Sequence, residues 1–567
     1  MNRYKIFSIF AASLLLFSGC YDLDRYPTDK LSSGTFFKTQ AHADQAMMGV
    51  YNAMQYDNVF GLQFSMDCMG GISCGYDPAS YQVFQKGTYD VKEGKVLDKW
   101  KYLYEGIARA NIVIQNVDNC DMSDELKTQY KGEAKFLRGL FYFTLLDFFG
   151  GVPIYDESIV VAENFNNMNL LRSSAEEVRT FVLKDLEAAI STLPAKWDDS
   201  NKGRATSGAA TALKGKVLLY NKQYADAAAC FESVVSSGNY ALYNDYENLF
   251  KPGGDDSNEM IFAIQNMGGV GTDIGMPMTF YMGTRASFGS CWNNVMVATD
   301  FVDSYEWKDG RPFDWEEVVP GFTTDNSIKD KTFRADVEKK SVIKAYPEAK
   351  DKLLEMYGKR DPRMAASVIL PYTMYKGWYK NAPMDCEYVI GKDGQDDGHN
   401  MIRVNGNYEN YLWRKFVAEY DMDGAINNRE DTPINFPLIR YADVLLMLAE
   451  CDNELGKQTD AVDLINQVRA RVDMPALNSG PAWLKAISKD EVFQRIKHER
   501  TVELAAEGHS FSDLRRWGLL ETLNGRAESG FTGKTYYTRK ITARDYLWPI
   551  PANEIEKNTG LTQNPGW

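Results

Sequence analysis

The sequence lacks the usual signatures of metal, nucleotide and nucleophile chemistry. It has four dispersed histidines in 567 residues, and neither an HExxH motif nor paired CxxC motifs, which are typical of zinc sites. It has no glycine-rich phosphate-binding fingerprint. Gly71-Ile72-Ser73-Cys74-Gly75 matches the G-x-S-x-G pattern of serine hydrolases, but no strand is predicted before it and no helix after it, and that chemistry requires both. We therefore expect no catalytic residues, metal ion or cofactor.

Cysteines are too few and too scattered to form a disulfide framework. Eight are present, and the seven beyond Cys20 are spread along the chain. An odd number at irregular spacing is not typical of a disulfide-stabilised domain. Pairing of Cys68 with Cys74 within one loop stays open. Stability is expected to come mainly from packing.

The chain also lacks an excess of positive charge. It contains 63 Lys and Arg against 78 Asp and Glu, a formal net charge of −15. Nucleic-acid binding depends on clustered basic residues, so we expect no nucleic-acid partner. A hydrophobic content of 44% excludes global disorder.

A long apolar run occurs only at the N-terminus. After a short positive segment, Ile6–Phe17 has the length of a signal-peptide core and is too short to span a bilayer. Small residues at 18 and 19 precede Cys20, as in lipoproteins whose cleavage leaves a lipidated N-terminal cysteine. Phe17 stands where that pattern usually has leucine, and an ordinary signal with an incidental cysteine is the alternative. The sequence predicts a lipid anchor on Cys20 and no transmembrane helix.

Helical periodicity dominates both ends of the mature chain. Apolar residues at three- and four-residue steps predict helices over 41–55, 97–117 and 124–149, and a capping-box pattern at Ser173–Glu176 predicts another that ends near Leu193. Residues 206–238 predict two helices around a turn at 221–223, with small residues facing bulky ones. Residues 436–455 and 458–472 predict a second such pair. This alternation is typical of tetratricopeptide repeats.

The middle of the chain differs from both ends. Between about residues 240 and 430 the periodicity weakens, while Gly, Pro, Asn, Asp and Trp are frequent. Long irregular segments on a rigid scaffold often carry binding residues. The acidic loop Asp393–Asp397 contains carboxylates such as calcium binds, but it lacks EF-hand spacing. A structural calcium ion is possible there without further support.

Loop aromatics are the positive functional signal. Their flat rings suit ligands such as sugars, which stack C–H faces on aromatic planes. Tyr76 and Tyr81 lie in one glycine-rich loop, Tyr281 and Trp292 in another, and Trp315 follows. Core packing is the ordinary role for any one of them. We predict that two or three of this set contact a ligand.

Several long motifs in order resemble the SusD/RagB family of outer-membrane nutrient-binding lipoproteins, over essentially the whole mature chain. The motifs are Gly132–Arg138 with Phe149–Pro153, Pro437–Val444 with Ala449-Glu450, Ile496–Arg500, Glu503–His509, Asp513–Gly518, Leu547–Pro551 with Glu554, and Gln563–Trp567. Charged residues among them fall at helical steps, so they are interpreted as scaffold residues whose charge pairs join neighbouring helices.

The resemblance implies a mainly α fold. A scaffold with tetratricopeptide-like helical pairs would carry an irregular, loop-rich ligand-binding part. It also implies a non-enzymatic, surface-exposed outer-membrane protein that binds a glycan and delivers it to a SusC-like TonB-dependent transporter. Trp292 precedes a segment that resembles the family's run into its binding region, so it is the first candidate for the aromatic platform. Tyr281, Tyr76, Tyr81 and Trp315 are further candidates.

The expected organisation follows from these segments. It comprises a signal peptide at 1–19, a flexible lipidated leader at 20–35, an N-terminal helical scaffold at 36–240, a ligand-binding part at 241–430, and a C-terminal helical scaffold with a packed tail at 431–567. Three alternatives stay open: a peptide or glycoprotein ligand for the same role, a lipid-anchored glycoside hydrolase, and a tetratricopeptide adaptor that binds only proteins. Paired catalytic carboxylates need only spatial proximity, so the sequence does not exclude a hydrolase.

Overall fold

The computed structural model describes residues 36–567, apart from 161–163, 165–167, 269–274, 339–341, 392–400 and 404–408, with the backbone alone at 401–403. The predicted signal peptide, the leader with Cys20 and the acidic loop at 393–397 lie outside the described residues. None of the described helices is long and apolar enough to cross a membrane.

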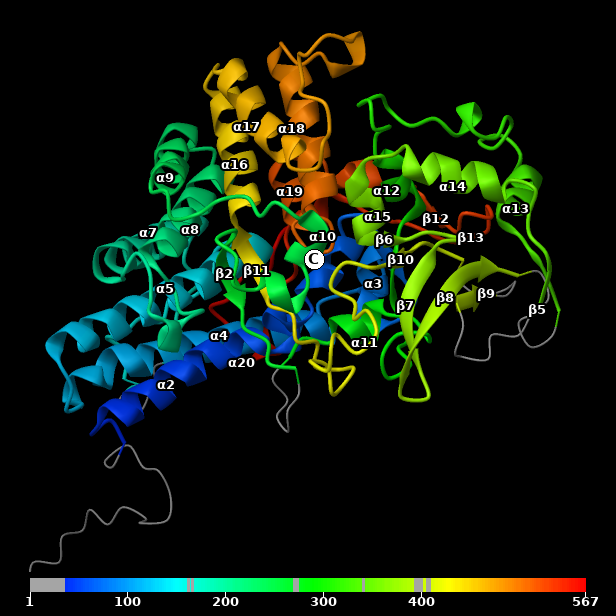
Figure 1. Ribbon diagram of the computed structural model, residues 1–567. Coiled ribbons are helices and arrows are strands. Elements are labelled where there is room, and N and C mark those ends of the chain that lie inside the picture. Colours follow the sequence, from blue (N-terminus) through cyan, green and yellow to red (C-terminus); the bar gives the residue numbers. More distant parts are fainter. Residues whose placement is uncertain are drawn as a thin grey trace, which may run out of the picture.

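A continuous helical layer forms one side of the molecule (Figure 1). Its helices are α2 (Gln40–Asn52), α4 (Gly94–Asn116), α5 (Asp124–Phe149), α7 (Ala175–Thr192), α8 (Ser207–Tyr220), α9 (Tyr224–Ser236), α16 (Tyr441–Glu454), α17 (Gln458–Ala470) and α18 (Lys489–Glu503). From α2 to α9 each helix packs against the next in this order, and α9 then packs against α16. The two ends of the chain thus form one scaffold, and the predicted mainly α fold is confirmed.

The predicted boundaries of the long helices agree with local capping. Ser123 caps α5 by accepting a hydrogen bond from the Leu126 amide, and the helix ends at Gly150, whose φ of 74° is readily adopted by glycine. A capping box starts α7, formed by Ser174 and Glu177 and therefore one residue later than predicted. Local sequence determined these ends directly.

Two tetratricopeptide-like pairs are present, as predicted. α8 and α9 pack so closely that a Cβ on Gly215 would lie 2.6 Å from the Phe231 ring. The second pair is α16 with α17. Its first helix begins at Tyr441, and the prediction of a helix from residue 436 is wrong. Residues Phe436–Arg440 form strand β11, which includes Pro437 and pairs antiparallel with β2 (Met260–Ile264).

The middle of the chain adds small sheets and short helices. The described strands form antiparallel pairs, except that β9 joins β8 in parallel. The strands besides β2 and β11 are β1 (Ser73–Gly75), β3 (Val295–Val297), β4 (Asp336–Glu338), β5 (Val342–Ala345), β6 (Val368–Ile369), β7 (Met374–Tyr379), β8 (Ala382–Ile390), β9 (Met401–Arg403), β10 (Leu412–Trp413), β12 (Ala527–Ser529) and β13 (Thr535–Thr538). The remaining α-helices are α3 (Gln82–Gln85), α10 (Tyr246–Leu249), α11 (Met278–Met282), α12 (Thr299–Ser304), α13 (Asn326–Phe333), α14 (Lys350–Gly358), α15 (Pro362–Ser367), α19 (Ser510–Arg516) and α20 (Ala552–Lys557).

One hydrophobic core runs through all these parts, from Phe37 to Leu561. The pairing of β2 with β11 also joins the middle of the chain to its C-terminal scaffold. Because one core crosses the predicted boundaries at 240 and 430, these boundaries do not mark separate cores. The ligand-binding role of the part between them stays a prediction. Cys68 and Cys74 are both free and buried, so they form no disulfide.

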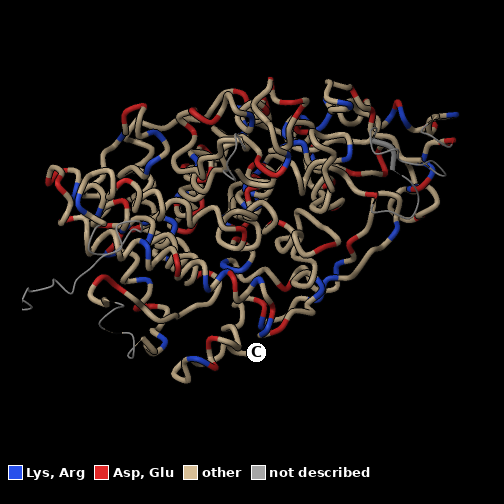
Figure 2. Tube along the Cα trace, turned by 90° about the horizontal axis from the view of Figure 1, so that it is seen from below, with Lys and Arg blue, Asp and Glu red and all other residues tan. Residues whose placement is uncertain are grey.

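Buried arginines cross-link the scaffold. Arg440, with a fully buried side chain, pairs with Glu259, Glu503 and Glu507 at 2.7–2.8 Å. Arg363 pairs in turn with Glu499 and Glu503, at 2.9 and 3.1 Å. Lys and Arg alternate with Asp and Glu along the trace without separating into regions of one sign (Figure 2). These ion pairs confirm the expectation that charged motif residues join neighbouring helices. We call Arg363 and Arg440, their partners Glu259, Glu499, Glu503 and Glu507, and the arginines paired with those carboxylates the buried charge network.

Candidate ligand-binding surface

A two-stranded sheet brings two of the predicted aromatics together. Strand β1 pairs antiparallel with β3, and Gly75 lies opposite Val295. The loops after β1 and before β3 therefore meet, although more than 200 residues separate them in sequence. The hydroxyl of Tyr76 donates a hydrogen bond of 2.9 Å to the carbonyl oxygen of Trp292. Both side chains are exposed, Trp292 by 46% and Tyr76 by 38%.

Helix α11 supports Trp292 from the other side. The Trp292 amide donates to the carbonyl oxygen of Phe280 at 3.0 Å, and the two rings lie 4.7 Å apart between centroids. Tyr281 follows in α11, half-buried, with its ring 4.9 Å from that of Phe280. Burial raises the pKa of Tyr281, and the negative charges of Asp57 and Asp77 raise it further. Three predicted residues, Tyr76, Tyr281 and Trp292, thus belong to one exposed cluster, the Trp292 surface.

Amide and carboxylate groups lie beside these rings. Asn294 donates through its side chain to Asp77, which also accepts from the Ser80 amide at 3.2 Å. The side-chain oxygens of Asn293 and Asn294 are buried and accept no hydrogen bond from any described residue. Buried acceptors without a partner are uncommon in folded proteins. Protein atoms cover both oxygens, so in this structure they are not accessible to a ligand.

Sequence reasoning missed two residues of this surface. The Phe280 ring packs against the Trp292 ring. The only sequence signal for Phe280 was its position next to Tyr281. Arg429 lies with its guanidinium 4.7 Å from the centre of the Phe280 ring and donates to the carbonyl oxygens of Gly289 and Ser290, both at 2.8 Å. It thereby holds the loop that leads to Trp292. No local pattern connects residue 429 with that loop.

Two predicted platform residues are core residues instead. Tyr81 is 1% exposed, with its ring 5.4 Å from that of Phe84. Trp315 is 5% exposed, stacks on Phe322 at 3.9 Å, and donates from its indole nitrogen to Asp303 at 2.9 Å. Rings already covered by protein leave no face for a ligand. The structure therefore removes Tyr81 and Trp315 from the predicted site.

The G-x-S-x-G match has no hydrolase geometry. As expected, the described residues directly before the serine form no strand: strand β1 begins at Ser73 itself. The Ser73 hydroxyl is fully buried and makes no hydrogen bond to any described residue. A nucleophilic serine needs a base within hydrogen-bond reach and an exposed hydroxyl. Ser73 has neither.

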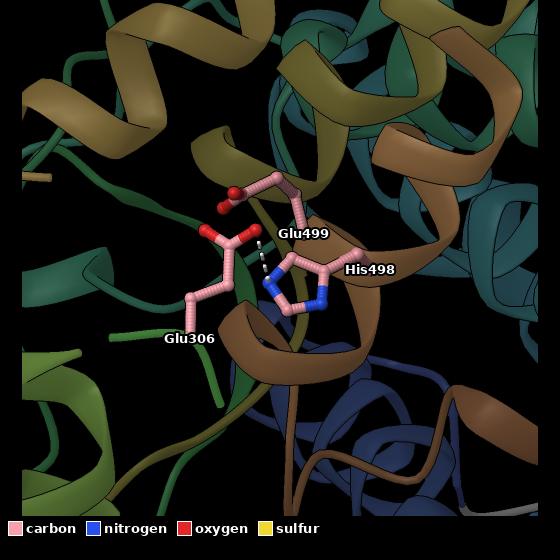
Figure 3. Close-up of side chains that lie close together, drawn as sticks. All are labelled: Glu306, His498 and Glu499. Carbon is pink, nitrogen blue, oxygen red and sulfur yellow. Dashed lines mark ion pairs between the residues drawn. The ribbon is translucent and has the colours of Figure 1, made fainter. Parts of the chain in front are cut away.

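Glu306, His498 and Glu499 cluster closely enough to suggest a cation site (Figure 3). His498 lies 3.9 Å from Glu306 between Nε2 and Oε1. Both carboxylates, however, are already paired with arginines: Glu306 with Arg469 and Arg495, and Glu499 with Arg363 and Arg469. A cation there would face three guanidinium groups at close range. The cluster is part of the buried charge network.

Comparison with known proteins gives consistent results over the whole chain. Residues 258–567 match the family described as "SusD family", and residues 23–219 match one described as "Starch-binding associating with outer membrane". SusD-like protein P25 of Formosa agariphila is 25% identical over 592 residues, which cover 99% of this chain and 98% of that protein.

Solved structures show the same fold. A SusD-like protein of Bacteroides fragilis superposes with a TM-score of 0.74 at 23% identity, covering 96% of this chain and all of that one. A laminarin-binding SusD-like protein superposes with a TM-score of 0.62 at 24% identity, covering 94% of this chain and all of that one.

Proposed function

The chain belongs to the SusD/RagB family, and we propose that it is a surface-exposed outer-membrane lipoprotein that binds a glycan and delivers it to a SusC-like TonB-dependent transporter. Two similarities support the glycan as ligand: the starch-binding description of the N-terminal match and the laminarin-binding structural neighbour. The same description, with its reference to the outer membrane, supports the location.

The observation that carries the proposal is the Trp292 surface. Trp292 exposes nearly half of its side chain at a point where Tyr76, Phe280 and Arg429 fix its loop. A ring held in place in advance loses little entropy when a sugar stacks on it. The partly exposed carboxylate of Asp77, next to Tyr76, would accept hydrogen bonds from sugar hydroxyls. This mechanism breaks no bond in the ligand.

Affinity electrophoresis over a panel of polysaccharides tests the ligand class. We expect at least one neutral glucan, such as laminarin or starch, to retard the protein, and Trp292→Ala to remove most of the retardation. No retardation by any polymer would contradict the proposal. If instead the purified protein released reducing sugar from a polymer that it binds, the hydrolase alternative would replace it.

The anchor is tested separately. We expect Cys20→Ala to move the protein from the membrane fraction to the soluble fraction while its glycan retardation stays unchanged. A membrane-bound Cys20→Ala variant would contradict the lipid anchor without affecting the ligand. Copurification of the untagged transporter with the tagged protein from solubilised envelopes tests the partner, and its absence would contradict delivery.

A further inference from the structure

A second cavity lies apart from the Trp292 surface, at the edge of β2. Its volume is about 460 Å³, within the range of small-molecule sites. Three parts of the chain form it: the connection from α7 to α8, the connection from α9 to β2, and β2 with Gln265 after it. Its lining includes Trp197, Tyr240, Asp255, Asn258 and Gln265. Neither the family motifs nor the Trp292 surface uses these residues.

The aromatic side chains of the cavity are held in fixed positions. The indole nitrogen of Trp197 donates to the carbonyl oxygen of Ala205 at 2.7 Å, and the guanidinium of Arg204 lies 5.1 Å from the ring centre. Arg204 is itself held by Glu133 at 2.7 Å. The hydroxyls of Tyr240 and Thr206 lie 3.1 Å apart. Both rings are therefore prepared for a ligand before it arrives.

The polar lining offers hydrogen bonds without an excess of charge. Its charged residues are three basic and three acidic: Lys196, Lys202, Arg204, Asp199, Asp255 and Asp256. Lys202 pairs with Asp256 at 2.8 Å, and Arg204 with Glu133. With equal numbers of acidic and basic side chains, and two of the three cations paired, the lining has no marked excess of one charge.

Asp255 differs from an ordinary surface carboxylate. One of its oxygens accepts a hydrogen bond from the Asn435 amide at 3.0 Å. Burial raises the pKa of Asp255 to about 7, and Asp256 adds to the shift. Near neutral pH the group can therefore accept a hydrogen bond or donate one. Sugar hydroxyls both donate and accept, so they match this group.

We propose that this cavity is a second saccharide-binding site, selective for an uncharged sugar. The inference rests on the proposed glycan-binding function and adds a separate site to it. Two fixed aromatic rings, carboxylate and amide groups, and a balanced charge in one cavity are its basis. Because the lining carries no marked excess of basic residues, we expect a uronate or sulfated sugar to bind no more tightly than an uncharged one.

The two sites adjoin one short stretch of the chain. The side-chain amide of Gln55 donates to the carbonyl oxygen of Gln265 at the cavity, at 3.0 Å. Two residues later, the charge of Asp57 contributes to the raised pKa of Tyr281 on the Trp292 surface. A glycan long enough to span from one site to the other would contact both. Its affinity then exceeds that of a short oligosaccharide, because the second contact forms within one complex.

Calorimetric titration of the whole mature protein with laminarihexaose and maltohexaose tests the second site. For whichever hexasaccharide binds, we expect two molecules per protein to saturate the wild type. One molecule should saturate either Trp292→Ala or Trp197→Ala. The double variant should bind none. Loss of the cavity should weaken binding of the parent polymer at least ~10-fold while hexasaccharide affinity at the other site is unchanged.

Two further variants make the result independent of folding defects. Asn239→Trp adds bulk at an exposed position of the cavity lining, so it should block the cavity without disturbing the core. Trp483→Ala removes an exposed tryptophan from outside both sites and should bind two molecules. Thermal melting confirms that each variant is folded.

The outcomes separate the two proposals. If Trp292→Ala abolished all binding while Trp197→Ala and Asn239→Trp kept the wild-type stoichiometry, the second site would be wrong and the proposed function would stand. If the wild type bound neither hexasaccharide nor any polymer of the panel, both would be wrong. Tighter binding of a sulfated hexasaccharide in the cavity would overturn the selectivity.

Discussion

The buried charge network and the Trp292 surface use opposite physical means. In the network, arginines of β11 and α15 and carboxylates of α18 and neighbouring segments are fully buried and pair with one another. At the Trp292 surface, an aromatic side chain is left exposed and two amide oxygens have no described partner. Three of the motifs that resemble the family contain network residues: Pro437–Val444, Ile496–Arg500 and Glu503–His509. The charges of the network are already satisfied by the protein, so residues that identify a fold need not be those that contact a ligand.

The largest expected effect comes from breaking the network. Arg440→Met removes one cation from three buried carboxylates, which keep Arg363, Arg471 and Lys415 as partners, and should lower the free energy of unfolding by about 3–5 kcal/mol. Urea denaturation measures this. Lys489→Met is the control, since its ion pair with Glu454 is exposed and should contribute less than about 1 kcal/mol. Equal effects of the two changes would contradict the distinction between network and surface.

The same change to alanine at two tryptophans sharpens the comparison. Trp315→Ala opens a cavity in the core and should cost about 3–5 kcal/mol of stability. Trp292→Ala should leave the melting temperature nearly unchanged but weaken glycan binding by about 2 kcal/mol, or ~30-fold. Melting curves and titrations on both variants measure the two effects. A stable Trp315→Ala variant that lost binding would reverse our assignment.

Acid should weaken the network as the pH falls below about 4.5, the pKa of a glutamate in the unfolded chain. Burial alone would raise the pKa of Glu499, but Arg363 and Arg469 lower it to about 2. A depressed carboxyl pKa contributes stability that is complete above the unfolded value near 4.5 and is lost as the pH falls towards 2. The loss from Glu499 should reach about 3 kcal/mol. Burial also lowers the pKa of His509 to about 4, which adds a loss between pH 6.5 and 4.

Urea unfolding at pH 6, 4 and 3 measures this dependence. Glu499→Gln should be less stable than the wild type at pH 6, yet its stability should change less between pH 4 and 3. If the free energy of unfolding of the variant changed as much as that of the wild type between pH 4 and 3, Glu499 would not titrate in this range.

The smallest expected effect concerns the support of Trp292. Tyr76→Phe removes the hydrogen bond to the Trp292 carbonyl oxygen and keeps the ring. One neutral hydrogen bond contributes about 0.5–1.5 kcal/mol, so affinity should fall roughly 2- to 10-fold without a change in stoichiometry. Tyr346→Phe removes a comparable exposed bond, to Glu387, and should change nothing. A loss as large as that of Trp292→Ala would mean that Tyr76 itself stacks on the ligand.

The sequence by itself determined the helices, the family and the absence of a disulfide framework. Helix α5 begins and ends at the predicted residues because its cap and its terminating glycine act locally. The strand at Phe436–Arg440 could not be predicted in the same way, since its partner β2 lies more than 170 residues earlier. Charged motif residues were assigned to the scaffold from helical spacing alone, but their partners were not predicted.

Only the tertiary structure decided which loop aromatics remain exposed. Trp292 and Trp315 lie in similar irregular sequence, yet one is 46% exposed and the other 5%. The difference arises from distant contacts: Phe322 covers Trp315, whereas β1 and α11 support Trp292 and leave a face open. Local sequence fixes the dihedral preferences of a loop and the size of its side chains. The direction in which a ring points depends on what the rest of the chain packs against it.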